Sequence, residues 1–400
     1  MASLKLNGVD KIYPSGTTAL YDINLETDEK EFIVILGSDG SGKTSLLRVI
    51  AGLDELSSGE ITVGGKDVTE ADPKDRDIAM IFRSNTLSPT MTVFDNLAFG
   101  LKIRKAPQTV IEQRVKAAAN ILGLNEVLYR KPKALTAAQK QRTAIGRAIV
   151  REPKLYLFDE PLSGLDENLQ AELLNVIVNM QARMEGTFLY TTKNVAEAMT
   201  VGTRIVVLKN GFLQQIDTPA NLYDYPANAY VAFLIGSPTI NFINNAKIIR
   251  EGETVYAAEG NIKLALPENI VKRFSALQDY VNGDRHIIIG IRPEDMSEGG
   301  DIEGAVTGVG EGVAEVEADG HSFTVVSDKL KKGEKTKISC DATRLYLFDG
   351  ETRLTLLQRD EGYVENGFAD SKFVPRTFNE EEEIKEKLKP SKDNKNKKSR

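Results

Sequence analysis

The stretch Gly37-Ser38-Asp39-Gly40-Ser41-Gly42-Lys43-Thr44, followed by Ser45, matches the pattern GxxxxGKS/T. It comes directly after the apolar run Phe32–Leu36 and directly before a helical apolar pattern at residues 46–50. Strand, glycine-rich loop and helix in this order are typical of a phosphate-binding loop, in which backbone N–H groups and a helix N-terminus surround the phosphates. The sequence therefore predicts an α/β domain of the P-loop NTPase class.

Two pairs of polar residues carry the expected chemistry. In such loops the lysine, here Lys43, reaches the terminal phosphates, and the following hydroxyl, here Thr44, ligates Mg²⁺. The apolar run 155–158 ends in Asp159-Glu160, the form of a second nucleotide motif. There the aspartate holds Mg²⁺ and the glutamate polarises the attacking water. A strand that simply ends in a solvated acid is the plainer alternative for this pair.

The bulk composition is that of an ordinary globular chain. Its 400 residues exceed the usual span of one hydrophobic core, and 41% are hydrophobic and 27% charged. The formal net charge of -7, without a basic stripe interleaved with aromatics, disfavours a nucleic-acid partner. Cys340 is the single cysteine, the start Met1-Ala2-Ser3-Leu4-Lys5 lacks a signal-peptide core, and no apolar run approaches the ~20 residues that span a bilayer. We expect a cytoplasmic protein whose membrane partners are separate chains.

Two domains and a tail are predicted along the chain. Residues 1–238 alternate short strands, such as 32–36, 155–158 and 205–208, with helical patterns such as 110–122, which Gly123 ends. Residues 239–358 change to short strands between glycine-rich turns, which predicts a small all-β, OB-like barrel domain. Its strands are expected at 246–249, 254–257, 262–266, 286–291, 313–316, 323–326 and 345–348. Residues 359–400, acidic and then lysine-rich, are predicted to be a flexible, disordered tail.

An ordered set of further motifs resembles the ATP-binding subunits of ABC importers. The set comprises Leu135-Thr136-Ala137-Ala138-Gln139, Phe158-Asp159-Glu160-Pro161, Ser163-Gly164-Leu165-Asp166, Ile235-Gly236-Ser237-Pro238 and Gly290-Ile291-Arg292-Pro293-Glu294-Asp295. The resemblance covers nearly the whole chain except the tail. It points to the sugar-importer branch, which is similar to the maltose and glycerol-phosphate systems, although importers for polyamines, sulfate or iron share much of this layout.

The resemblance implies ligands, partners and a location. ATP and Mg²⁺ bind at a dimer interface, where each ATP lies between the phosphate loop of one subunit and the signature of the other. Tyr13 stacks on adenine, with a plain packed tyrosine as an equal alternative, and Asp166 belongs to the D-loop. The second domain is regulatory. The implied partners are integral-membrane permease subunits, a second ABC ATPase subunit and, indirectly, an extracellular solute-binding protein, at the cytoplasmic face of the cell membrane. The implied cargo is a carbohydrate or related organic solute.

The signature departs from the family pattern LSGGQ, because Ala137 and Ala138 replace the two glycines. Their methyl groups remove the freedom with which glycine amides approach a phosphate. Thr136 and Gln139 still form the sequence of a helix capping box, so the helix itself is expected to persist. A capped helix start without further function is the plainer alternative.

The other two departures replace polar switches by cations. Arg83 stands where the family has a glutamine that ligates Mg²⁺, and arginine has donors only. Lys193 stands where the family has a switch histidine, and the two histidines, His286 and His321, both lie in the second predicted domain. Each cation can contact phosphate as a charge, but neither reproduces the residue it replaces. An ordinary exposed arginine and lysine are the alternatives.

These changes predict ATP binding with weak self-hydrolysis. The loop glycines Gly40 and Gly42, with Lys43, Thr44 and Asp159, are all present and carry most phosphate and Mg²⁺ contacts. Loss of one preorganised donor typically costs about 10² to 10³ in rate. A heterodimer with a second ATPase is favoured over a homodimer tuned to the two cations. The alternative functions are a soluble ABC ATPase outside transport and a regulatory ATP-binding protein.

Overall fold

The computed structural model describes residues 3–83 and 87–357, and its backbone divides into two compact units. The first unit ends at Leu213 and the second begins at Gln214. The tail predicted at residues 359–400 lies outside the described part, and the domain limits at 238 and 358 stay predictions. Within the described ranges, no helix combines the length and the apolar character that crossing a bilayer requires.

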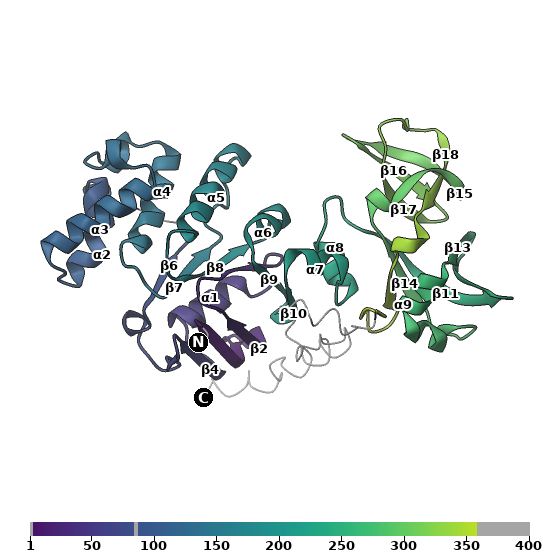
Figure 1. The fold of residues 1–400 in the computed structure, drawn as a ribbon, viewed down its shortest axis with the longest axis horizontal. Coiled ribbons are helices and arrows are strands. Elements are labelled where there is room, and N and C mark those ends of the chain that lie inside the picture. Colours follow the sequence, from purple (N-terminus) through teal and green to yellow (C-terminus); the bar gives the residue numbers. More distant parts are fainter. Residues whose placement is uncertain (1–2, 84–86, 358–400) are drawn as a thin grey trace, which may run out of the picture. The chain divides into compact units, whose positions relative to one another are not determined.

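The first unit supplies five strands, and the first two residues of β10, to a sheet with the strand order β10-β9-β3-β8-β7-β6 (Figure 1). Its strands are β3 (Phe32–Leu36), β6 (Ile78–Ile81), β7 (Leu155–Asp159), β8 (Thr187–Thr192), β9 (Arg204–Lys209) and β10 (Phe212–Asp217). Strands β3, β6, β7, β8 and β9 pair in parallel. Every residue of β3 and β7 is buried, which explains their continuous apolar runs. The strands predicted at 32–36, 155–158 and 205–208 are confirmed.

A second sheet of the first unit is antiparallel, in the order β2-β1-β4-β5. It contains β1 (Leu4–Ile12), β2 (Thr18–Thr27), β4 (Ser58–Val63) and β5 (Lys66–Asp67). Buried and exposed positions alternate along β1 and β2, as expected of strands that pack on one face. This sheet carries Tyr13 in the turn between its first two strands.

The helices of the first unit are α1 (Lys43–Ala51), α2 (Val93–Ile103), α3 (Gln108–Ile121), α4 (Ala137–Ile149), α5 (Glu167–Gln181) and α6 (Val195–Val201). Short 3-10 helices occur at Pro73–Asp75, Asn125–Val127 and Pro132–Ala134. Helix α3 confirms the amphipathic helix predicted at 110–122, because Ile111 and Val115 are buried and Gly123 follows its end with φ of 63°. Helices α2, α3 and α4 form one group, which lies apart from α1 in Figure 1.

The second unit contains two antiparallel sheets, ordered β13-β12-β11-β14-β19 and β17-β16-β15-β18. The strands are β11 (Asn241–Glu251), β12 (Thr254–Glu259), β13 (Ile262–Leu266), β14 (Ile287–Ile291), β15 (Met296–Val309), β16 (Val313–Ala318), β17 (His321–Val326), β18 (Lys335–Cys340) and β19 (Tyr346–Asp349). The helices are α7 (Pro219–Asp224), α8 (Ala229–Leu234) and α9 (Glu268–Arg273), with 3-10 turns at Ser275–Tyr280, Pro293–Asp295 and Ala342–Arg344. One core, which includes Ile243, Val316 and Phe323, joins the two sheets.

Arg292 of the motif Gly290-Ile291-Arg292-Pro293-Glu294 is a structural residue of this second unit. Its guanidinium is buried and donates to the carbonyl oxygens of Ala232, at 3.0 Å, and Tyr223, at 3.2 Å. It also donates to the carbonyl oxygen of Ile235. The motif therefore ties α7 and α8 to the end of β14.

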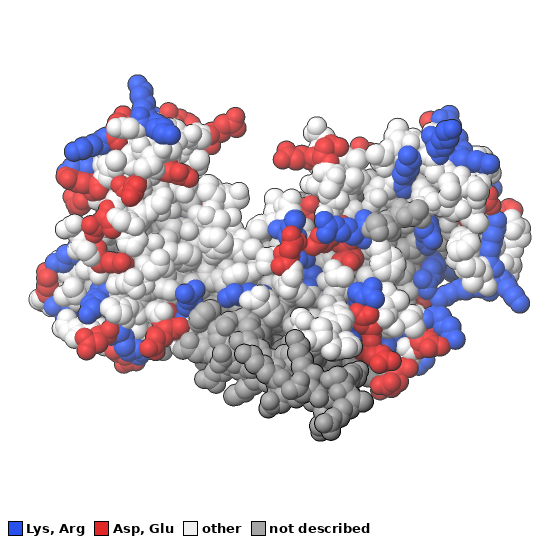
Figure 2. Space-filling model, turned by 180° about the vertical axis from the view of Figure 1, so that it is seen from behind, with Lys and Arg blue, Asp and Glu red and all other residues white. Residues whose placement is uncertain are grey.

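Charged side chains of both signs are scattered over the face of the described residues that Figure 2 shows. On the face in Figure 2, Lys and Arg side chains are interspersed with Asp and Glu side chains. This mixture is ordinary for a globular protein with a net charge of -7 over the whole chain.

Candidate functional site

The strand register brings Arg83 and Glu160 to the same edge of the parallel sheet. Ile81 of β6 lies opposite Phe158 of β7, so Arg83 and Glu160 each stand two residues beyond this pair. In open α/β sheets, ligands bind outside the carboxyl ends of the strands. Two segments far apart in the sequence thus enter one site.

The neighbouring strands bring Asp159, Lys193 and the phosphate loop to that edge as well. Asp159 lies opposite Thr191 of β8, and Thr192 lies opposite Leu36 of β3. Lys193 follows Thr192 directly, and the phosphate loop follows Leu36 directly. The predicted phosphate, metal and switch residues of four strands therefore converge.

Two glycines of the phosphate loop pack so closely against neighbouring backbone that a side chain would not fit at either position. Gly42, with φ of 104°, precedes α1, and a Cβ placed on it would lie 2.5 Å from the carbonyl oxygen of Ala19. A Cβ on Gly37 would lie equally close, at 2.5 Å, to the carbonyl oxygen of Leu208. The Ser41 Oγ is buried and has no hydrogen-bond partner among the described residues. A glycine cradle, an unpaired hydroxyl and the first N–H groups of α1 together fit a phosphate.

Lys43 is placed at the centre of this loop. Its side chain is 4% exposed, and its Nζ donates to the carbonyl oxygens of Gly37, at 2.8 Å, and Ser38, at 2.9 Å. The same Nζ lies 3.4 Å from Oε1 of Glu160. A buried ammonium held by neutral carbonyls and one carboxylate is well placed to bind an incoming phosphate.

Thr44 and Asp159, the two residues predicted to hold Mg²⁺, lie within hydrogen-bond distance of each other. The Thr44 Oγ1 donates to Oδ1 of Asp159 at 2.9 Å, and the Thr191 hydroxyl lies 3.2 Å from the same oxygen. Hydroxyl and carboxylate oxygens beside a phosphate are the ligands that Mg²⁺ uses in nucleotide sites. These donors fit Mg²⁺ carried in with a nucleotide.

Glu160 has a strained backbone and a buried carboxylate. Its φ is 42°, which is uncommon for a residue with a side chain, and its N–H donates to Thr191 Oγ1 at 3.0 Å. The side chain is 9% exposed, and Arg83 Nη1 lies 3.5 Å from Oε2 while Lys43 lies beside Oε1. Both oxygens of the carboxylate that would polarise water therefore face a cation.

Lys193 is paired with the phosphate loop itself. Its Nζ donates to Oδ2 of Asp39 at 3.1 Å, and both side chains are largely exposed. This hydrogen bond and the charge of Lys193 lower the pKa of Asp39, and the charges of Lys43 and Arg83 act in the same direction. Lys193, Lys43 and Arg83 therefore all lie close enough to Asp39 for their charges to stabilise its carboxylate.

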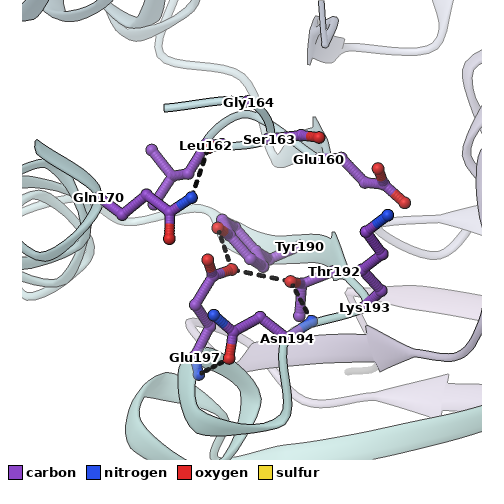
Figure 3. Close-up of a pocket in the computed structure, with 10 residues that line it drawn as sticks. All are labelled: Glu160, Leu162, Ser163, Gly164, Gln170, Tyr190, Thr192, Lys193, Asn194 and Glu197. Atoms are coloured by element: carbon purple, nitrogen blue, oxygen red, sulfur yellow. Dashed lines mark hydrogen bonds between the residues drawn. The ribbon is translucent and has the colours of Figure 1, made fainter. Parts of the chain in front are cut away.

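A pocket of about 160 Å³ opens beside Glu160 and Lys193, which extend toward each other in Figure 3. It is lined by Glu160, Leu162, Ser163, Gly164, Gln170, Tyr190, Thr192, Lys193, Asn194 and Glu197. The hydroxyls of Tyr190, at 2.9 Å, and Thr192, at 2.7 Å, both donate to Oε2 of Glu197. Burial and the Glu197 charge raise the pKa of Tyr190, so its hydroxyl stays a donor. This network fixes the backbone from which Lys193 extends.

Tyr13 is anchored beside α1 by its hydroxyl. The hydroxyl lies 3.0 Å from Ser45 Oγ and donates to Oδ2 of Asp54 at 3.1 Å. Arg48 holds Asp54 with two hydrogen bonds of 2.8 Å, which lower the pKa of this carboxyl. The aromatic ring therefore has a defined place next to the phosphate loop, while its stacking on adenine stays a prediction.

The altered signature begins helix α4, away from the phosphate loop. The N–H of Gln139 donates to Thr136 Oγ1 at 3.2 Å, and the N–H of Thr136 donates to Gln139 Oε1 at 3.1 Å, which confirms the predicted capping box. Ala137 is exposed and Ala138 half-buried in the first turn. Across residues 3–83 and 87–357, none of the hydrogen bonds or ion pairs joins this turn to the phosphate loop.

Asp166, the predicted D-loop residue, caps helix α5. Its Oδ1 accepts a hydrogen bond of 3.0 Å from the N–H of Leu169, as an N-cap residue does. Gln141 of α4 donates to the carbonyl oxygen of Pro161 at 2.6 Å, which connects the signature helix to the segment that follows Glu160.

Sequence reasoning missed three residues that support the site, namely Thr191, Asp54 and Glu197. Thr191 contacts both Asp159 and Glu160, and in the sequence it stands two residues before Lys193. Asp54 and Glu197 carry no motif, and their roles follow from contacts with Tyr13 and with Tyr190 and Thr192.

Comparisons with known proteins agree with this geometry. The family model for the ABC transporter matches residues 20–163, and the model for the MalK OB fold domain matches residues 236–296. The oligosaccharides import ATP-binding protein MsmX of Bacillus subtilis is 45% identical over 74% of this chain and 80% of its own length. The osmoprotective compounds uptake ATP-binding protein GgtA of Synechocystis is 44% identical over 74% of this chain and 78% of its own.

A solved structure shows the same fold for the first part of the chain. CbiO1 of Clostridium perfringens, part of the ABC transporter complex cbiONQ, aligns with a TM-score of 0.53 and 28% identity, over 56% of this chain and 91% of that one. The predicted α/β P-loop domain followed by an OB-like domain is therefore confirmed. From the phosphate-loop geometry and these relatives, this chain belongs to the ABC transporter family, as the ATP-binding, ATPase subunit of an importer with a MalK-type OB-fold domain.

Proposed function

We propose that this subunit binds Mg-ATP and couples closure around the nucleotide to the uptake of a carbohydrate or a related organic solute. The convergence of Lys43, Thr44, Asp159 and Glu160 at one sheet edge carries the proposal. The cargo class is supported by relatives that are named for the import of oligosaccharides and the uptake of osmoprotective compounds. Thr44 and Asp159 would hold Mg²⁺, which would supply positive charge to neutralise the phosphates.

The site of this chain alone favours ATP binding over ATP hydrolysis. The Glu160 carboxylate, which orients water in this family, faces Lys43 and Arg83 instead of a neutral amide. The switch position holds Lys193, which is paired with Asp39. Loss of one preorganised donor to developing charge costs about 10² to 10³ in rate. Slow self-hydrolysis follows.

The complete site requires a second ATPase chain. The signature turn of α4 lies outside the phosphate loop of its own chain, so a partner's signature has to close over the ATP. The methyl groups of Ala137 and Ala138 obstruct the close approach of this chain's own signature to another phosphate. A heterodimer, in which a second subunit supplies an intact signature, fits these features better than a homodimer.

A groove beside α2 is the surface proposed for the permease. It measures about 360 Å³ and is lined by Ala51, Leu53, Pro73, Lys74, Ile78, Met80, Phe82, Gly100, Ile103, Arg104 and Arg151. Ile103 is 65% exposed, and Leu53 and Phe82 are also exposed, which is unusual for large apolar side chains on one patch. An apolar cytoplasmic segment of a permease subunit is the proposed occupant of this groove, and such docking would hold the chain at the cytoplasmic face of the membrane.

Copurification tests the importer proposal. The tagged chain, extracted with detergent from membranes of its own cells, is expected to retain an integral-membrane protein and a second ABC ATPase. Ile103→Asp is expected to lower permease recovery at least about fivefold, because a charge in the groove has to be desolvated on docking. Val178→Asp, on the exposed face of α5, is the control and should recover the permease at the wild-type level. Recovery of ribosomes or DNA in place of a membrane protein would contradict the importer function.

A further inference from the structure

Two cations near the phosphate loop are each held by a carboxylate of the same site. Arg83 Nη1 lies 3.5 Å from Glu160 Oε2, and Lys193 Nζ lies 3.1 Å from Asp39 Oδ2. Asp39 belongs to the phosphate loop. Glu160 contacts Lys43, whose ammonium donates a hydrogen bond to the carbonyl oxygen of Gly37 in the same loop. The two pairs therefore flank the place where the outermost phosphate of a nucleotide would lie.

Both pairs are weak enough to exchange partners. The Arg83 side chain is 59% exposed and the Lys193 side chain 53% exposed, so water and salt screen each attraction. A terminal phosphate offers three oxygens and more negative charge than one carboxylate. Arginine and lysine donate charge-assisted hydrogen bonds to such oxygens.

We propose that Arg83 and Lys193 form a two-cation clamp for the terminal phosphate of ATP, each moving to it from Glu160 or Asp39. The clamp rests on the nucleotide-binding function proposed above. It distinguishes a triphosphate from a diphosphate by charge, and it does so without a metal ion, because both contacts come from side chains of the protein.

The test measures ATP and ADP affinity of the full chain by isothermal titration calorimetry in a buffer with EDTA. The wild type is expected to bind ATP about 100-fold more tightly than ADP. Arg83→Gln and Lys193→Gln should each lower the ATP affinity about tenfold and leave the ADP affinity unchanged. A tenfold loss is what removal of one charge-assisted hydrogen bond typically costs. Lys193→Arg, which keeps the charge, should restore most of the ATP affinity.

Lys5→Gln is the matched control. Lys5 forms an exposed pair of 3.2 Å with Glu26 in the antiparallel sheet, and its side chain is 54% exposed, close to the value of Lys193. This variant should bind both nucleotides as the wild type does. Equal ATP affinity in the wild type and the two glutamine variants would overturn the clamp while leaving the ATP-binding function in place. Failure of the wild type to bind ATP even with Mg²⁺ would overturn both.

Discussion

Lys43→Met is expected to weaken ATP binding by about 100-fold or more. The methionine side chain retains the buried stem of Lys43 but removes the ammonium that lies between two loop carbonyls and Glu160. Charge-assisted hydrogen bonds contribute roughly 1.5–3 kcal/mol each, so losing the contacts to two phosphates costs about 3 kcal/mol or more. Titration calorimetry with Mg-ATP measures the change.

The control for this prediction separates binding from folding. Lys5→Met removes an exposed ammonium in the same unit and should leave the ATP affinity unchanged. Thermal unfolding followed by circular dichroism should show both variants folded at the titration temperature. A folded Lys43→Met variant with wild-type affinity would place the nucleotide elsewhere than in the Gly37–Ser45 loop.

Restoring the family residues is expected to raise ATP turnover by about 100-fold or more. The variant combines Arg83→Gln, Lys193→His, Ala137→Gly and Ala138→Gly. It replaces two cations that face carboxylates with a neutral amide and an imidazole, and it removes two methyl groups from the first turn of α4. One preorganised donor alone is worth about 10² to 10³ in rate. Steady-state phosphate release by the purified protein, at concentrations that favour dimers, measures the gain.

The two glycines of that variant require a check of their own. Glycine in a helix costs about 1 kcal/mol relative to alanine, and here both positions lie in the first turn. The capping box between Thr136 and Gln139 stays in place and should hold the helix start. The variant with only Arg83→Gln and Lys193→His, which keeps α4 unchanged, should give an intermediate rate. A restored protein that is folded and no faster than the wild type would show that these positions do not limit turnover.

The phosphate loop was predictable because its determinants are local. Strand β3 spans Phe32–Leu36 and helix α1 begins at Lys43, as the motif and its apolar flanks predict. The capping box of Thr136 is local in the same sense, since its two hydrogen bonds join residues three positions apart. Such features need no knowledge of which strands are neighbours.

The carboxylate partners of Arg83 and Lys193 were not predictable from the sequence. The pair between Arg83 and Glu160 exists because β6 lies beside β7 in a particular register, and the pair between Lys193 and Asp39 because β8 lies beside β3. Strand order and register depend on packing of the whole unit. The sequence therefore indicated the positions of the two cations but not what they contact.

The long strand β15 of the second unit was not predicted, for a different reason. Strand β15, Met296–Val309, contains Gly299 and Gly300 with φ of 88° and 107°, and its pairing with β18 shifts between Glu298 and Ile302. Two adjacent glycines are typical of a turn, so a prediction from the sequence pattern ends the strand at them. In the structure they form a bulge, and the strand continues. Strand β13, Ile262–Leu266, alternates buried and exposed residues regularly and was predicted with its observed bounds.

We infer that this subunit holds ATP well and hydrolyses it slowly by itself. The most direct measurement incubates the purified wild-type chain with radiolabelled Mg-ATP, removes free nucleotide rapidly and identifies what remains bound. We predict about one nucleotide per chain, recovered mainly as intact ATP after a time in which the restored variant converts its nucleotide to ADP. Recovery of ADP from the wild type at the rate of the restored variant would contradict the account.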